Sequence, residues 1–147
     1  WTAPVVEKVG RSAVAPVASE ALQIHAAQGE FEPFQLVVRS STEQSFAVSI
    51  SSFTGAGGTI PASAVKLHRV DYVTITELSD DFGRLGPWPD PLYPVAMGGM
   101  VTFPAGLNQP LWFTVEVPRD AEAGVYEATV SIGAATVPVD ARKVAAE

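Results

Sequence analysis

The 147-residue chain contains no cysteine, and this absence removes several classes of protein at once. Disulfide frameworks, thiolate catalysis and cysteine-based zinc sites all require the thiol, so cysteine usage leaves the redox compartment open. Basic residues are few: nine Lys and Arg stand against sixteen Asp and Glu, a formal net charge of −7. Because a surface of this sign repels phosphate backbones and anionic membranes, nucleic acid is not an expected partner.

Long hydrophobic runs and helical periodicity are also missing. No apolar stretch approaches the roughly 20 residues that cross a bilayer, and no basic segment precedes an apolar one at the N-terminus. The sequence begins at Trp1 without a methionine. We therefore expect that a signal peptide has been removed from a secreted protein and that the sequence is cut from a longer chain. Its length predicts one domain with a single hydrophobic core.

The sequence does contain segments in which apolar and polar residues alternate strictly, and the clearest lies between Asn108 and Ile132. In the first part Leu111, Phe113 and Val115 share one face, and Pro118 ends the run. From Tyr126 onward, apolar and polar residues alternate again. This period of two is typical of half-buried strands, so the stretch predicts a strand, a connection and a second strand of an antiparallel all-β domain.

The same pattern predicts further strands along the chain. They are Val5–Val9, Leu22–Ala27, Phe34–Arg39, Ser45–Phe53, Val65–Glu77, Met100–Phe103 and Ala135–Asp140. The apolar phase slips inside Val65–Glu77, which indicates a bulge or bend near Val70–Val73. Gly133-Ala134 predicts a tight hairpin, and the glycine-rich Thr54–Gly58 predicts a mobile loop. The predicted core includes Phe34, Leu36, Val38, Phe113, Val115 and Val130.

Leu78–Gly99 has four prolines, four glycines and no sustained period, so we expect one long loop. Its aromatic content predicts that this loop is packed rather than disordered. With eight to ten strands in total, the fold class is a two-sheet antiparallel β-sandwich, immunoglobulin/fibronectin-like or jelly-roll-like. We expect the domain to span residues 1–140 and residues 141–147 to begin a linker to a following domain.

Three segments together resemble the N-terminal β-sandwich domain of glycoside hydrolase family 123 and of relatives with uncharacterised barrels. They are Gly29–Gln35 (GEFEPFQ), Asp90-Pro91-Leu92, and Asn108–Trp112 continued through Val117-Pro118 to Ala123–Tyr126. In that family the catalytic carboxylates belong to the barrel, so none is carried over to this chain. The resemblance implies a non-catalytic accessory domain that supports the catalytic barrel of a larger, secreted protein.

Few polar residues suggest chemistry of their own. Glu30 and Glu32 share a strand face, but glycosidase carboxylates normally oppose each other across a cleft, so solvation or backbone hydrogen bonding is the favoured interpretation. A structural Ca²⁺ could be bound by Asp80, Asp81 and Asp90, although their spacing matches no EF-hand. The alternative interpretation is that they are ordinary turn-forming residues. His25 and His68 are expected at surface or hydrogen-bonded positions. Gly55–Gly58 lacks the lysine and helix of a phosphate loop.

The aromatic residues Trp88, Tyr93 and Trp112 are the candidate ligand-binding residues. A flat indole or phenol ring can stack on the C–H face of a sugar, which makes a carbohydrate-binding module the alternative function. The favoured interpretation is packing, with Trp112 covered by the long loop and Trp88 packed against it or against a neighbouring domain. No catalytic residue, metal or cofactor is predicted. The expected partner is the catalytic domain of the same parent chain, with glycan as a second possibility.

Overall fold

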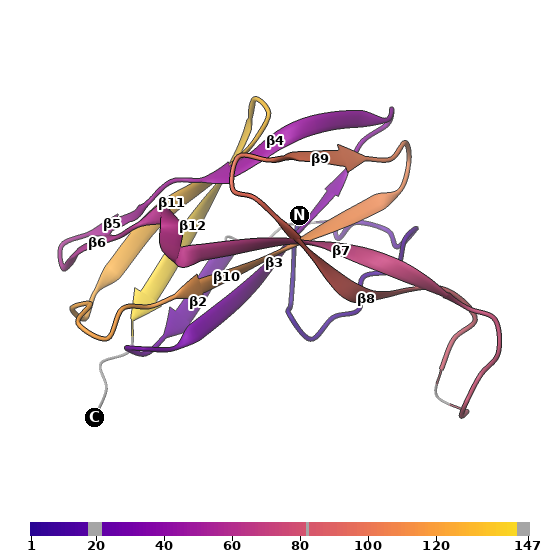
Figure 1. Cartoon of the computed structure of the whole chain (residues 1–147), viewed down its shortest axis with the longest axis horizontal. Helices are drawn as coiled ribbons and strands as arrows, with labels where there is room; N and C mark the ends of the chain where they lie inside the picture. The colour runs from indigo at the N-terminus through magenta and orange to yellow at the C-terminus, as the bar shows by residue number, and fades with distance from the viewer. Residues whose placement is uncertain (18–21, 82, 144–147) are drawn as a thin grey trace.

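The chain folds into two β-sheets packed face to face (Figure 1). The computed structural model describes residues 1–17, 22–81 and 83–143. Within these residues the only helical element is a 3₁₀ turn, Ala62–Ala64, so the all-β prediction is confirmed. No helix among them is long and apolar enough to span a bilayer.

One sheet has five strands and the other is built on a path of five with a short hairpin beside it. The first sheet has the order β1 (Thr2–Ala3), β3 (Phe31–Arg39), β10 (Asn108–Glu116), β7 (Val65–Ile75) and β8 (Gly86–Val95). The second has the order β2 (Leu22–Ala26), β12 (Ala135–Lys143), β11 (Val125–Ile132), β4 (Gln44–Ile50) and β9 (Met100–Phe103), and β5 (Phe53–Gly55) joins β6 (Gly58–Ile60) to β11. The described residues form twelve strands, more than the eight to ten that were predicted.

The core lies between the two sheets and is built from the alternating residues of the central strands. Phe34 on β3 is directly opposite Phe113 on β10, and their rings stack with centroids 4.7 Å apart. Val130 from the second sheet is fully buried in the same cluster. Of the six predicted core residues five are buried; Val38 is only half-buried, because it lies near the end of β3.

The stretch from Asn108 to Ile132 joins the two sheets. Its two strands do not pair with each other: β10 lies between β3 and β7, while β11 lies between β12 and β4. The connection after Pro118 therefore carries the chain from one sheet to the other. The hairpin at Gly133-Ala134 is confirmed, since Ile132 pairs with Ala135 and Gly133 has a φ of 58°.

The predicted long loop at Leu78–Gly99 is wrong in its second half, where β8 forms. Proline lacks a backbone N–H and is tolerated mainly in edge strands, and β8 is the last strand of its sheet. The predicted irregularity in β7 is confirmed: Val70 pairs with Leu92 but Tyr72 pairs with Pro89, which places the extra residue on β8. The β7–β8 pair extends away from the C-terminal end of the chain (Figure 1).

Four further expectations need correction. Val5–Val9 is not a strand; the N-terminal pairing comes from Thr2 and Ala3 instead. The glycine-rich segment forms the β5–β6 hairpin, in which Gly55 lies against the Val125 carbonyl so closely that a Cβ could not fit. β2 pairs with β12 in parallel, so the sandwich is not wholly antiparallel. β12 continues to Lys143, past the predicted end at Asp140, and residues 144–147 lie outside the described part.

Candidate functional site

The three candidate aromatic residues do not share one face of the sheet. Trp112 pairs with His68, whereas Tyr93 pairs with Arg69, the next residue along β7. Because successive residues of a strand point to opposite faces, Trp112 and Tyr93 lie on opposite sides of the sheet. Trp88 lies five residues from Tyr93 on β8, roughly 15 Å along the strand. The three residues therefore occupy separate positions, and the common stacking platform considered from the sequence is not formed.

Each of these aromatic residues has its own surroundings. Tyr93 is 51% exposed, with the Arg69 guanidinium 5.6 Å from its ring centroid. Trp88 is half-buried and lines a small cavity of about 220 Å³ together with Ile75 and Leu78. Trp112 is half-buried on the outer face, beside His68. The buried Nδ1 of His68 has no hydrogen-bond partner, so this atom does not match the expectation of a surface or hydrogen-bonded position.

The glutamates at the start of β3 have structural surroundings. The Glu30 carboxylate accepts a hydrogen bond of 2.8 Å from the backbone N–H of Ala27, which closes the turn between β2 and β3. Burial raises the pKa of Glu32, the Glu30 charge raises it further, and His25 lowers it. Both carboxylates lie at one strand entry and not across a cleft, so the geometry does not form a glycosidase pair.

In the β7–β8 region, Asp80 and Asp90 have different partners. Asp80 accepts a hydrogen bond of 3.0 Å from the N–H of Gly83, as expected of a turn residue. Asp90 forms an exposed ion pair with Lys8 at 3.5 Å. Across the described ranges, no group of three or more His, Cys, Asp or Glu side chains is arranged to hold a metal ion.

A different region, which was not singled out from the sequence, shows the most polar organisation. The irregular segment that follows β1 lies against the outer face of the five-stranded sheet, and buried amide side chains of that sheet bind its backbone. Asn108 donates to the carbonyls of Gly10 and Ala13, each at 2.9 Å, and Gln35 donates to the carbonyls of Pro4 and Glu7 at 3.2 and 3.3 Å. The Tyr72 hydroxyl donates to the Val9 carbonyl at 2.9 Å. An irregular segment can pack on a sheet only when its backbone polar groups find such partners.

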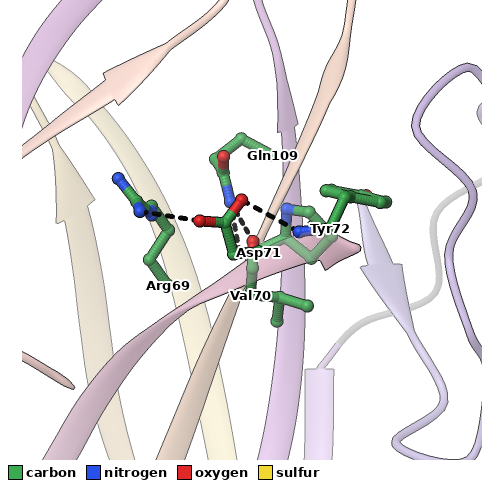
Figure 2. A network of polar contacts seen from close by, with 6 residues as sticks. Arg69, Val70, Asp71, Tyr72 and Gln109 are labelled. Atoms are coloured by element: carbon green, nitrogen blue, oxygen red, sulfur yellow. Dashed lines mark hydrogen bonds and ion pairs between the residues drawn. The ribbon is translucent and has the colours of Figure 1, made fainter. Parts of the chain in front are cut away.

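The distorted part of β7 positions Tyr72 for this contact (Figure 2). Asp71 accepts a hydrogen bond from the Tyr72 N–H at 2.9 Å and pairs with Arg69 at 3.0 Å. Gln109, buried on β10, donates to the Val70 carbonyl at 2.7 Å. Desolvation by burial raises the pKa of Tyr72 to about 12, with a smaller raising effect from Asp71 and a lowering effect from Arg11. The phenol is therefore a stable hydrogen-bond donor at neutral pH.

At the opposite end of the sandwich two connections meet. The Gly29 N–H donates to the Val117 carbonyl and the Val117 N–H donates to the Glu30 carbonyl, both at 2.9 Å. Gln28 reaches the carbonyl of Ala121 at 2.9 Å. This end also carries the start of β11 and the end of β12 (Figure 1). Two of the segments that resemble the glycosidase family are therefore in direct contact here.

Fold and sites together define a two-sheet β-sandwich domain without a convergent set of catalytic groups in its described residues. A family model described as the glycoside hydrolase 123 N-terminal domain matches residues 10–134. The chain belongs to this family. A comparison of the sequence with curated proteins finds no match.

A solved structure of a family 123 enzyme shows a similar fold. A family 123 glycoside hydrolase from Clostridium perfringens, from a study of glycolipid glycan hydrolysis, is similar with a TM-score of 0.69 and 17% sequence identity. The similarity covers 86% of this chain and 23% of the length of that enzyme. The seventh PapD-like (ASH) domain of human CEP192 is 10% identical over 99% of both chains, with a TM-score of 0.39.

Proposed function

We propose that this chain is a non-catalytic accessory domain that docks on and supports the catalytic barrel of a larger glycoside hydrolase 123-like protein. The observation that carries the proposal is the family match to an N-terminal domain, which is distinct from the catalytic domain. The surroundings of Glu30 and Glu32 agree with it, because neither carboxylate faces a second one across a cleft. The domain then contributes stability and position rather than chemistry.

The end of the sandwich that carries the two connections is the proposed docking surface. Phe31 at the start of β3 is 55% exposed and Val125 at the start of β11 is 50% exposed. Lys143, the last described residue, pairs with Ala26 at the same end. In a family where this domain is N-terminal, the catalytic domain follows the last strand, so exposed apolar side chains beside that strand are well placed for an interdomain contact.

The test uses a chain that carries both domains. Phe31→Ser with Val125→Ser is expected to lower the unfolding temperature of the catalytic domain by several degrees, measured by calorimetry, because the contact that covers these side chains is weakened. The matched control is Leu92→Ser on β8, which is also exposed but lies at the other end. If the double variant and the control leave the catalytic domain equally stable, the proposed surface is wrong.

The alternative function is glycan binding through Trp88, Tyr93 or Trp112, and it stays a prediction. The separation of the three side chains favours the accessory role, because a single sugar chain cannot stack on both faces of a sheet. Titration of the domain with neutral N-acetylhexosamine oligomers is expected to leave tryptophan fluorescence unchanged at millimolar ligand. A saturable change that Trp88→Ala removes would support the carbohydrate-binding alternative. Secretion of the parent protein is proposed on the family resemblance, and cell fractionation tests it.

A further inference from the structure

A pocket of about 670 Å³ lies between the N-terminal segment and the edge strand β8. Its volume falls within the range of small-ligand sites. The charged side chains that line it are Lys8, Arg11, Arg84 and Glu7. Three of the nine Lys and Arg residues of a chain with net charge −7 are thus gathered around one concavity. Leu85 and the Pro87–Pro89 stretch form an apolar wall, and Ser12 adds a hydroxyl.

Arg11 is held in place without an anionic partner. Its guanidinium carbon lies 4.7 Å from the centroid of the Tyr72 ring, and the Tyr72 hydroxyl is itself fixed by the Val9 carbonyl. The Nη1 atom of Arg11 is buried and has no hydrogen-bond partner. A buried, charged donor without a partner is costly, and in native proteins it requires an explanation.

The positive charge of the pocket is not fully neutralised by nearby carboxylates. In the described ranges neither Arg11 nor Arg84 forms an ion pair. Lys8 pairs with Asp90, but both side chains are more than half exposed, and such a pair contributes little stability. Glu7 is the one carboxylate among the residues that line the pocket.

The pocket is also preorganised. The segment that carries Lys8 and Arg11 is fixed through its carbonyls by Asn108, Gln35 and Tyr72, as described above. The Asp71 hydrogen bond that orients the backbone of Tyr72 belongs to the same arrangement (Figure 2). A ligand that binds here does not need to order the segment, which lowers the entropic cost of binding.

We propose that this pocket binds the anionic group of an acidic saccharide, a carboxylate or a sulfate, with Arg11 and Arg84 as its principal ligands. Guanidinium groups bind planar or tetrahedral oxyanions through paired N–H donors, and the proline-lined wall offers apolar contact to the sugar ring. A concavity of about 670 Å³ fits one or two sugar units better than an extended acidic peptide, which needs a long groove or a free strand edge with backbone donors. The prolines at positions 87 and 89 remove such donors from β8. The proposal is independent of the docking surface at the other end.

The test is a calorimetric titration of the 147-residue chain with galacturonate oligomers of two to four units, sulfated galactose oligomers, neutral galactose oligomers and polyglutamate. We expect saturable binding, weakened by added salt, of at least one of the two acidic sugars and not of the neutral one. Which acidic sugar binds distinguishes the carboxylate from the sulfate source.

The exposed Arg84→Gln is expected to weaken that binding at least tenfold, while Arg119→Gln, a charge-matched change outside the pocket, leaves it unchanged. Arg11→Gln should weaken it further, and circular dichroism checks that this variant is folded. The proposal fails if neutral and acidic sugars bind alike, if no acidic sugar binds, if polyglutamate alone binds, or if Arg84→Gln has no effect.

Discussion

The two faces of the five-stranded sheet are covered in different ways. On the inner face, Phe34, Leu36 and Phe113 pack against the second sheet in one large apolar cluster. On the outer face the buried apolar cluster is small, with Ala3, Val9 and Val37 at its centre. There the N-terminal segment is attached mainly by side chains that donate hydrogen bonds to its carbonyls.

This difference follows from the backbone groups of the two structures that pack on the sheet, the second sheet on one face and the N-terminal segment on the other. A second sheet satisfies its own backbone groups in its ladders, so apolar contact is sufficient to bind it. An irregular segment presents free carbonyls, and the sheet has to supply donors at buried positions. Asn108 and Gln35 are such positions, and both are almost fully buried. The outer cover therefore also fixes charged side chains in place, which the apolar inner face could not do.

The largest effect should come from the inner face. Phe113→Ala is expected to lower the free energy of unfolding by about 3–5 kcal/mol, because the ring is fully buried and stacked on Phe34. Trp112→Ala changes the next residue, which points to the outer face and is half-buried, and should cost roughly half of that or less. Urea denaturation of both variants measures the two losses. Equal losses would mean that the two faces are equally well packed.

A smaller loss is expected from the outer face. Asn108→Ala removes one donor from each of the Gly10 and Ala13 carbonyls, which should cost about 1–3 kcal/mol. Hydrogen exchange should show loss of protection concentrated in the N-terminal segment. Thr114→Ala, on the same face of the same strand, is the matched control and should leave that segment protected. Uniform loss of protection over both sheets would contradict a separate outer cover.

Alkaline pH gives a third way to separate the two faces. Burial raises the pKa of Tyr72 from 10.0 to about 12, so between these values the unfolded chain releases the proton first and the folded chain loses stability. Tyr72→Phe removes this pH dependence and costs about 1 kcal/mol at neutral pH, where the Val9 carbonyl loses its donor. Phenolate absorbance during titration should show a late ionisation that is missing in the Tyr72→Phe variant.

The smallest effect should come from an apolar side chain of the outer cover itself. Val6 is 86% exposed, so Val6→Ala is expected to change the free energy of unfolding by less than about 0.5 kcal/mol. Asn108→Ala is measured in the same denaturation experiment. The difference between the two losses shows how much of the stability comes from hydrogen bonds to the segment's carbonyls and how much from its exposed apolar side chains. A loss as large as that of Asn108→Ala would show that apolar contact holds the segment.

Local signals account for the strands that were predicted correctly. Alternation placed β10 and β11, and the slip of the apolar phase in β7 located the irregularity between Val70 and Tyr72. Two-residue turn chemistry placed the hairpin before β12. β8 was missed because its prolines read as a loop, and only its place at the sheet edge makes them compatible with a strand.

The candidate sites show the limit of the sequence more clearly. The residue types predicted that Glu30 binds backbone and that Asp80 belongs to a turn, because each partner lies three residues away. No local pattern links Arg11 to Arg84, which lines the same pocket, or to Tyr72, which it contacts, since each pair is more than sixty positions apart in the sequence. The buried amides of Gln35, Asn108 and Gln109 could have been a signal, because polar residues at core-facing or covered strand positions need specific partners.

The sequence by itself determined the all-β class, most strand positions, the core phenylalanines and the family, because each depends on short-range periodicity or short motifs. Only the tertiary structure decided that β10 and β11 belong to different sheets, that β2 and β12 run parallel, and that the N-terminal segment closes a basic pocket against β8. These features arise from contacts between distant segments. Which distant segments pair is decided by packing and hydrogen bonding in three dimensions, and it cannot be predicted from the residues adjacent in the sequence.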